Sequence, residues 1–190
     1  SNASATLWNE QGHSDSLGGL NSNFTNSYGY DISSDGSRVV GKSWNEDFDF
    51  QAFLWTEASG MIGLGLTDPR PRGHYSEAVG ISSDGSTVIG ITTEIGYYAP
   101  FVWNDSSALR VLDAPDGFTW ASSYDSYFDL DVSGDGSVIV GGGLYGSAAG
   151  PSAFIYTSSG GVRLLSNYLE SLGLDLAGWT LTNASGISEN

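Results

Sequence analysis

Short apolar runs separated by clusters of Gly, Ser, Asp and Asn make up most of the chain. Residues 87–93 and 99–104, for example, are rich in Val, Ile, Phe and Trp and are bounded by turn residues. Runs of this kind are typical of short β-strands. In this part of the chain we expect strands at 78–82, 87–93, 99–104 and 109–113. The pattern therefore predicts an all-β protein.

One arrangement of polar and apolar positions occurs three times. Its first copy, residues 32–41, reads Ile-Ser-Ser-Asp-Gly-Ser-Arg-Val-Val-Gly, and an Ala-Phe-Leu-Trp block follows at 52–55. A period of about 50 residues with four strands in each unit is the size of a propeller blade. We expect a repeat protein with a half repeat at 5–20, repeats at 28–66, 75–115 and 127–166, and the start of the next repeat at 181–190.

These units predict a small β-propeller of about four four-stranded blades in one domain, residues 4–190. Residues 1–3, Ser-Asn-Ala, are typical of a scar left by tag cleavage and are set aside. The half repeat carries strands three and four, and the last residues carry strand one, so a ring could close with a blade built from both ends. That blade would lack strand two, and we expect this strand to come from residues beyond Asn190 or from another molecule.

The Ser-Asp-Gly-Ser segments, as at 34–37, join the first two strands of each unit, and Asp-Gly supplies the positive φ of a tight turn. This gives the aspartate a structural role rather than a place in a calcium loop. The aromatic residues at one repeat position are expected in the core: Trp8, Trp55, Trp103 and Tyr156.

Two further structural roles are expected outside the strands. Phe24, Tyr124 and Trp179 each precede the first Ile or Val of a unit by eight residues, which indicates a packing role for all three. Asn167 followed by Glu170 resembles a capping box and predicts a short helix between Ser166 and Gly173.

The charge balance excludes several classes of partner. With 22 acidic against 6 basic residues the net charge is -16, so the clustered basic residues that nucleic acids or anionic membranes need are missing. There is no cysteine, which excludes disulfides and thiolate sites. No apolar run is long enough for a membrane-spanning helix, so we expect no membrane insertion.

These repeats resemble the HAF-repeat family of bacterial extracellular proteins, whose units combine Ile-Ser-x-Asp-Gly-x-x-Val-x-Gly with Ala-Phe-Leu-Trp and a trailing Leu-Gly. The match covers nearly the whole chain, although the third copy has Tyr156 for Trp and Leu165-Ser166 for Leu-Gly. The resemblance implies an extracellular, cell-surface or periplasmic location. The family is defined by its repeat, so the resemblance transfers no catalytic residues.

The longer connections are expected on one face of the disc, which makes that face the candidate binding surface. Aromatic residues that do not follow the repeat gather in these connections, with few charges beside them, as on surfaces that stack on sugars or dock proteins. The candidate ligand-binding residues are Trp44, Tyr97, Tyr98, Trp120, Tyr127, Arg70, Arg72 and His74.

Three functions stay open. The leading hypothesis is a non-catalytic binding or scaffold module for a glycan or surface protein. The first alternative is a glycan-active hydrolase or lyase with paired carboxylates such as Asp47 and Asp129, and the second is a purely structural passenger or stalk segment. We expect no cofactor, and Glu46, Asp47 and Asp49 are the candidate ligands if calcium binds.

Overall fold

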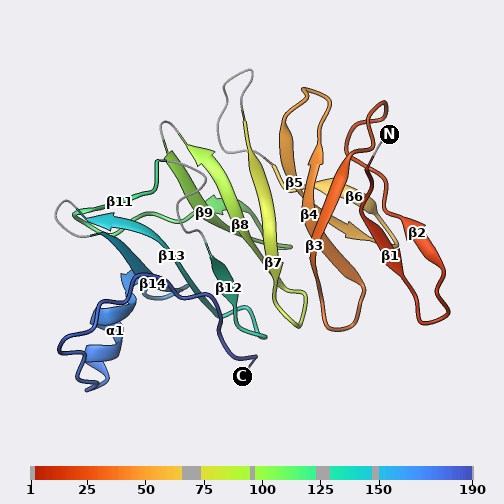
Figure 1. Ribbon diagram of the computed structural model, residues 1–190. Coiled ribbons are helices and arrows are strands. Elements are labelled where there is room, and N and C mark those ends of the chain that lie inside the picture. Colours follow the sequence, from red (N-terminus) through yellow and green to blue (C-terminus); the bar gives the residue numbers. More distant parts are fainter. Residues whose placement is uncertain (1–2, 66–73, 95–96, 123–128, 147–149, 190) are drawn as a thin grey trace.

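Three antiparallel sheets of consecutive strands, which we call blades one to three, follow one another along the described residues (Figure 1). The computed structural model describes residues 3–65, 74–94, 97–122, 129–146 and 150–189. Blade one contains β3 (Ser27–Ile32), β4 (Arg38–Trp44), β5 (Phe50–Thr56) and β6 (Gly60–Gly63), in that order. Blade two contains β7 (Ser76–Ile81), β8 (Thr87–Glu94), β9 (Tyr97–Asn104) and β10 (Ser107–Val111).

Blade three repeats this order and gains one strand. It contains β12 (Leu130–Val132), β13 (Val138–Gly146), β14 (Pro151–Thr157) and β15 (Gly161–Leu164), and β11 (Phe118–Trp120) pairs with the far end of β13. The all-β fold of four-stranded propeller blades is therefore confirmed. The strands expected in the second repeat lie within three residues of their observed bounds.

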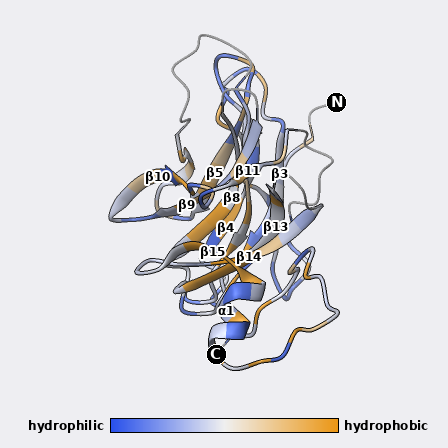
Figure 2. Ribbon diagram, turned by 90° about the vertical axis from the view of Figure 1, so that its left-hand side faces the viewer, coloured by the Kyte–Doolittle hydropathy of each residue, from blue (hydrophilic) through white to orange (hydrophobic). Residues whose placement is uncertain are grey.

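The core lies between successive blades. Val40 and Leu54 of blade one pack with Ile81 and Val88 of blade two, and a second cluster joins blades two and three. Figure 2 shows the hydrophobic strands in the middle of this stack. A phenylalanine of strand three is fully buried in each blade: Phe53, Phe101 and Phe154. Burial on both faces explains why these strands are apolar throughout instead of alternating.

The Ser-Asp-Gly-Ser turns are held by their own side chains. Ser33 donates its N–H to the Arg38 carbonyl (3.0 Å), and only the glycine, Gly36, has a positive φ (72°). Asp35 accepts hydrogen bonds from the Ser33 hydroxyl (2.7 Å) and the Ser37 N–H (3.0 Å). The predicted structural role of the aspartate is confirmed. Its side chain accepts hydrogen bonds within the turn, and the positive φ comes from the glycine.

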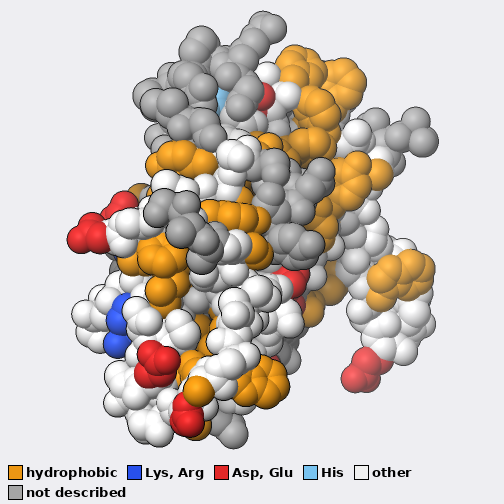
Figure 3. All heavy atoms as spheres, turned by 60° about the vertical axis from the view of Figure 1, so that its left-hand side comes forward, with side chains coloured by type: hydrophobic (Ala, Val, Ile, Leu, Met, Phe, Trp, Pro, Cys, Tyr) orange, Lys and Arg blue, Asp and Glu red, His pale blue; other side chains and the backbone are white. Residues whose placement is uncertain are grey.

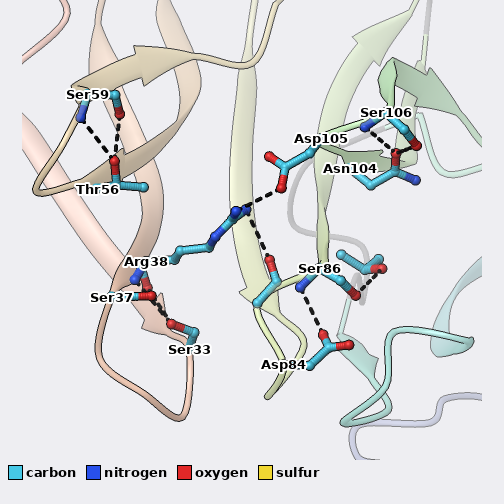
Figure 4. Close-up of polar contacts among 12 residues, drawn as sticks. Ser33, Ser37, Arg38, Thr56, Ser59, Asp84, Ser86, Asn104, Asp105 and Ser106 are labelled. Atoms are coloured by element: carbon cyan, nitrogen blue, oxygen red, sulfur yellow. Dashed lines mark hydrogen bonds and ion pairs between the residues drawn. The ribbon is translucent and has the colours of Figure 1, made fainter.

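Neighbouring turns are joined across blades (Figure 4). The Arg38 guanidinium of blade one donates to the Gly85 carbonyl (3.3 Å) and pairs with Asp105 (2.7 Å), both in blade two. Ser34 donates its N–H to the Ser83 carbonyl in the next turn. The repeated turn therefore connects the blades as well as reversing the chain.

The turn carboxylates predict part of the acid sensitivity of the fold. The Ser33 hydroxyl and the Ser37 N–H lower the pKa of Asp35 from the usual 3.8 to about 2, and Ser137 and Ser133 do the same for Asp135. A lowered folded-state pKa stabilises the protein above pH 3.8 and loses that effect as the pH falls to about 2. We expect a D35N/D135N variant to show a shallower fall of the urea midpoint over this range. An unchanged slope would contradict this assignment.

The short helix α1 (Leu165–Ser171) follows β15 directly. The predicted helix is confirmed, but the predicted capping box is wrong because the helix begins at Leu165, before Asn167, and has no side-chain cap. Gly173, with a φ of 87°, ends it as expected.

The two ends of the chain do not form a joint blade among the described residues. β1 (Thr6–Trp8) and β2 (Ser14–Ser16) form a two-stranded sheet beside blade one, whereas the C-terminal end lies near β12 (Figure 1). Trp8 is 67% exposed, so its prediction as a core residue is wrong. Trp55 lies opposite Val39 of β4, whereas Trp8, among the described residues, lies opposite only Ser14 of β2.

Candidate functional site

A rigid turn at residues 45–49 holds Phe48 outward. The Asn45 side-chain oxygen accepts the N–H groups of Asp47 and Asp49 (both 3.0 Å), and the Asn45 N–H donates to the Asp49 carbonyl (3.0 Å). Phe48 has a φ of 62°, a region that non-glycine residues rarely occupy, and its side chain is 56% exposed. Backbone strain of this kind concentrates at functional sites.

A second turn of the same construction lies beside it. The Asn21 side-chain oxygen accepts the N–H groups of Asn23 (2.8 Å) and Phe24 (3.1 Å), and its amide donates to the Asn45 carbonyl (2.8 Å). Phe24 is 46% exposed and meets Phe48 edge to face, with ring centroids 5.5 Å apart. We call Phe24 and Phe48 the phenylalanine pair. Because both turns are braced, the pair is preorganised.

An aromatic strip continues from blade one to blade two. Phe50 contacts Trp44 (ring centroids 4.8 Å apart), Tyr28 (6.1 Å) and Tyr75 (6.2 Å), and Tyr75 contacts Tyr98 (6.2 Å). These five residues form the aromatic strip. Its members are partly exposed, and hydrophobic side chains form an interrupted band over the molecule in Figure 3. Such a surface can contact a ligand through ring faces and edges.

The Lys42 side chain contacts two rings of the aromatic strip, Phe50 and Tyr75. Its ammonium group donates to the Tyr75 hydroxyl and to Glu77 (both 2.9 Å) and lies 5.0 Å from the centre of the Phe50 ring. Burial alone would lower the pKa of Lys42, but the Tyr30 hydroxyl and the Glu77 carboxylate outweigh it and raise the pKa. Lys42 therefore stays charged and fixes the rings around it.

The sequence-predicted residues do not all meet. Trp44 and Tyr98 belong to the aromatic strip, whereas Tyr97 is 39% exposed and lines a separate cleft of about 180 Å³ with Phe118 and Thr119. His74 is buried, which corrects its place on the binding face. Three candidates lie outside the described residues: Arg70, Arg72 and Tyr127.

Trp120 is a core residue and not a ligand platform, which corrects the prediction. Its side chain is 5% exposed, its indole N–H donates to the Leu112 carbonyl (2.7 Å), and its ring meets Phe154 edge to face at 5.2 Å. The strand β11, which carries Trp120 into the core, had no repeat signal in the sequence. An edge of Trp120 still lines the cleft beside Tyr97.

The acidic candidates are dispersed. Glu46 accepts the Ser22 N–H (2.9 Å), so it braces the two turns, and the described residues contain no group of three His, Cys, Asp or Glu placed to hold a metal ion. Asp47 lies in blade one, whereas Asp129 precedes β12 of blade three and accepts a hydrogen bond from Asn183. Blade two lies between them (Figure 1), so the structure does not bring this carboxylate pair together.

Of the seven residues in the phenylalanine pair and the aromatic strip, the sequence predicted only Trp44 and Tyr98 as ligand-binding residues. Tyr28, Phe48, Phe50 and Tyr75 were not singled out as binding residues. The packing role expected for Phe24 and Trp179 is wrong, since both are exposed, and Tyr124 lies outside the described residues. One signal was present: Asn21-Ser-Asn-Phe24 and Asn45-Glu-Asp-Phe48 share an Asn-x-x-Phe pattern.

No helix in the described ranges is long and apolar enough to cross a membrane.

No protein-family model and no curated protein matches the sequence. Among solved structures, the chain is similar to a TolB from Agrobacterium tumefaciens, with a TM-score of 0.54 and 16% identity over 86% of this chain and 56% of that one. It is also similar to TolB from Acinetobacter baumannii, with a TM-score of 0.52 and 15% identity over 85% of this chain and 37% of that one. The chain thus spans about half or less of these structures, and the likeness concerns the fold.

Proposed function

We propose that the protein is a non-catalytic binding module outside the cytoplasm, which recognises a glycan or a surface protein through the phenylalanine pair and the aromatic strip. The observation that carries this proposal is the preorganised, exposed Phe24–Phe48 pair beside a continuous set of rings. Exposed aromatic residues held rigid by their surroundings lose little entropy on binding.

The composition and the repeat support the location. The resemblance to the HAF-repeat family implies export, and a surface rich in Gly, Ser and Asn with few charges is typical of secreted β proteins. The hydrolase alternative loses its candidate pair, because Asp47 and Asp129 lie in different blades. Release of reducing sugar from a soluble glycan would nonetheless favour that alternative over binding alone.

The binding surface can be tested with matched variants. Thermal unfolding with a panel of neutral polysaccharides and purified surface proteins identifies a ligand, because a ligand at about 100 times its Kd adds roughly 2.7 kcal/mol to the free energy of unfolding. We expect an F24S/F48S variant, and separately W44A, to weaken binding of that ligand about tenfold or more. W179A, which removes an aromatic residue that is 76% exposed elsewhere, is the control. Equal losses in all three variants would contradict the assignment, and no ligand at all would favour the structural alternative.

A further inference from the structure

The half repeat β1–β2 is docked on blade one as one blade docks on the next. The Ala5 N–H donates to the Ser27 hydroxyl (3.0 Å), and the equivalent Ala52 N–H of blade one donates to Ser76 of blade two (2.9 Å). Ala5 and Leu17 pack on Val39 of blade one. The half repeat therefore occupies the place of strands three and four of a preceding blade.

The inner part of this face of blade one is uncovered. Ile32 is 43% exposed, whereas its counterparts Ile81 and Val132 are 5% and 8% exposed. Strand two of the preceding blade makes the difference: Val40 belongs to the cluster that contains Ile81, and Ile89 to the cluster that contains Val132. Among the described residues, β1 pairs only with β2, so its other edge is also open.

We propose that the open edge of β1 and the exposed Ile32 side chain together bind a β-hairpin of this same repeat, namely strands one and two of a blade. We call this surface the hairpin site. Addition of strands to an open edge supplies backbone hydrogen bonds, and a side-chain pocket supplies specificity. The site is separate from the phenylalanine pair and the aromatic strip, so it does not depend on the function proposed above.

A carboxylate between blades shows which hairpin fits. Asp31 of blade one accepts the N–H of Ile81 in blade two (2.8 Å), and Asp131 of blade three accepts the N–H of Ile187 (2.8 Å). In both cases glycine precedes the isoleucine, and a Cβ on Gly80 or Gly186 would lie 3.8 Å from that carboxylate oxygen. A blade with glycine here thus takes its carboxylate from the blade before it.

Blades with their own aspartate behave differently. Asp31 also accepts the N–H of its neighbour Ile32 (2.8 Å), and Asp131 that of Val132 (2.9 Å). Blade two, which precedes Asp131, has Gly80 at this position. Because blade one has Asp31, the hairpin that fits it should carry glycine, as blade two does. An aspartate in the hairpin would bring a second carboxylate beside Asp31, which is unfavourable.

The peptide of residues 76–94, which contains β7, β8 and Gly80, tests the proposal when it is titrated into the full chain by calorimetry. We expect binding at one peptide per chain. Peptides with Gly80→Asp or Ile89→Glu, and the protein variant I32E, should each weaken binding about tenfold or more, because each places a charge in an apolar or acidic contact. Ile32 is exposed, so I32E should fold.

A second measurement covers the cost of ordering an isolated hairpin, which is marginally stable in water. The same hairpin, joined ahead of Ala3 by a Gly/Ser linker, acts at a high effective concentration. We expect a higher Tm than for the chain alone, and a smaller increase when the fused hairpin carries Gly80→Asp or Ile89→Glu. No binding of the peptide together with no gain in Tm would overturn the proposal. Equal binding of the Gly80→Asp peptide would also overturn the proposal. Self-association of the chain that the peptide does not inhibit would overturn it too, because the surface would then bind a second copy.

Discussion

Replacing Lys42 by methionine is expected to lower the free energy of unfolding by about 3–5 kcal/mol. The Lys42 and Glu77 side chains are only 14% and 4% exposed, and the ammonium group lies 2.9 Å from the carboxylate. Removing Lys42 takes the positive charge away from the buried Glu77 carboxylate, and breaking a buried ion pair in this way is the costly case. The loss should appear as a lower midpoint of urea unfolding with an unchanged slope.

The double variant K42M/E77L separates the pair from its surroundings. Well-packed apolar residues often replace a buried ion pair at little cost, so the double variant should recover most of the stability lost by K42M. A loss below about 1 kcal/mol in K42M would mean that water screens the pair as it screens a surface salt bridge. In that case the rings around Lys42, and not the charge, would hold blades one and two together.

Much of the fold could be predicted from the sequence because the repeat contains its own packing code. Apolar residues at fixed spacing, an Asp-Gly turn and a closing glycine occur in each copy, and each has one structural role. Trp8 departs from that pattern for a physical reason: Trp55 is partly covered in a strand that pairs with β4 on one side and β6 on the other, whereas β1, which carries Trp8, pairs only with β2 among the described residues. A pattern within one repeat cannot report which neighbours are present.

The candidate site was less predictable because its residues do not repeat. Trp44 and Tyr98 were found because they do not follow the repeat. Trp120 does not follow it either, but it is buried because its own strand β11, which is outside the repeat, pairs with β13 and places the ring against Phe154. Exposure depends on contacts between segments far apart in sequence, such as Asn21 with Asn45. Composition in a loop shows which side chains are available and not which way they face.

The hairpin site and the Lys42–Glu77 ion pair both involve polar groups at the contacts between blades. Blade one contacts blade two through two polar side chains as well as apolar ones. Asp31 accepts the Ile81 N–H, Lys42 pairs with Glu77, and Val40 belongs to the apolar cluster between the two blades. Apolar clusters occur at both interfaces between the three blades, so apolar contacts by themselves do not determine which hairpin fits blade one. The buried or half-buried carboxylates can select the hairpin, because an unmatched charge beside them is costly.

The closing glycine of each repeat predicts the second large effect: we expect G90A to lower the free energy of unfolding by about 3 kcal/mol. A Cβ on Gly90 would lie 2.0 Å from the Glu77 carbonyl oxygen and 2.5 Å from the Phe101 ring. Both neighbours are fixed, since Phe101 is fully buried and the Glu77 carbonyl belongs to β7. The methyl group can therefore be accommodated only by separating β7 from β8 or by displacing the ring.

The thermal unfolding midpoint measures this effect, with an expected fall of about 6–12 °C for a domain of this size. G150A is the matched control, because a Cβ on Gly150 would meet no atom of the described residues within 4 Å, apart from its chain neighbours. Gly41 occupies the same place in blade one, where a Cβ would lie 1.9 Å from the Tyr28 carbonyl oxygen, so G41A should behave like G90A. If the midpoints of G90A and G150A were equal, β7 and β8 would be able to move apart at little cost. Close packing within the blade would then not explain the glycine at this position.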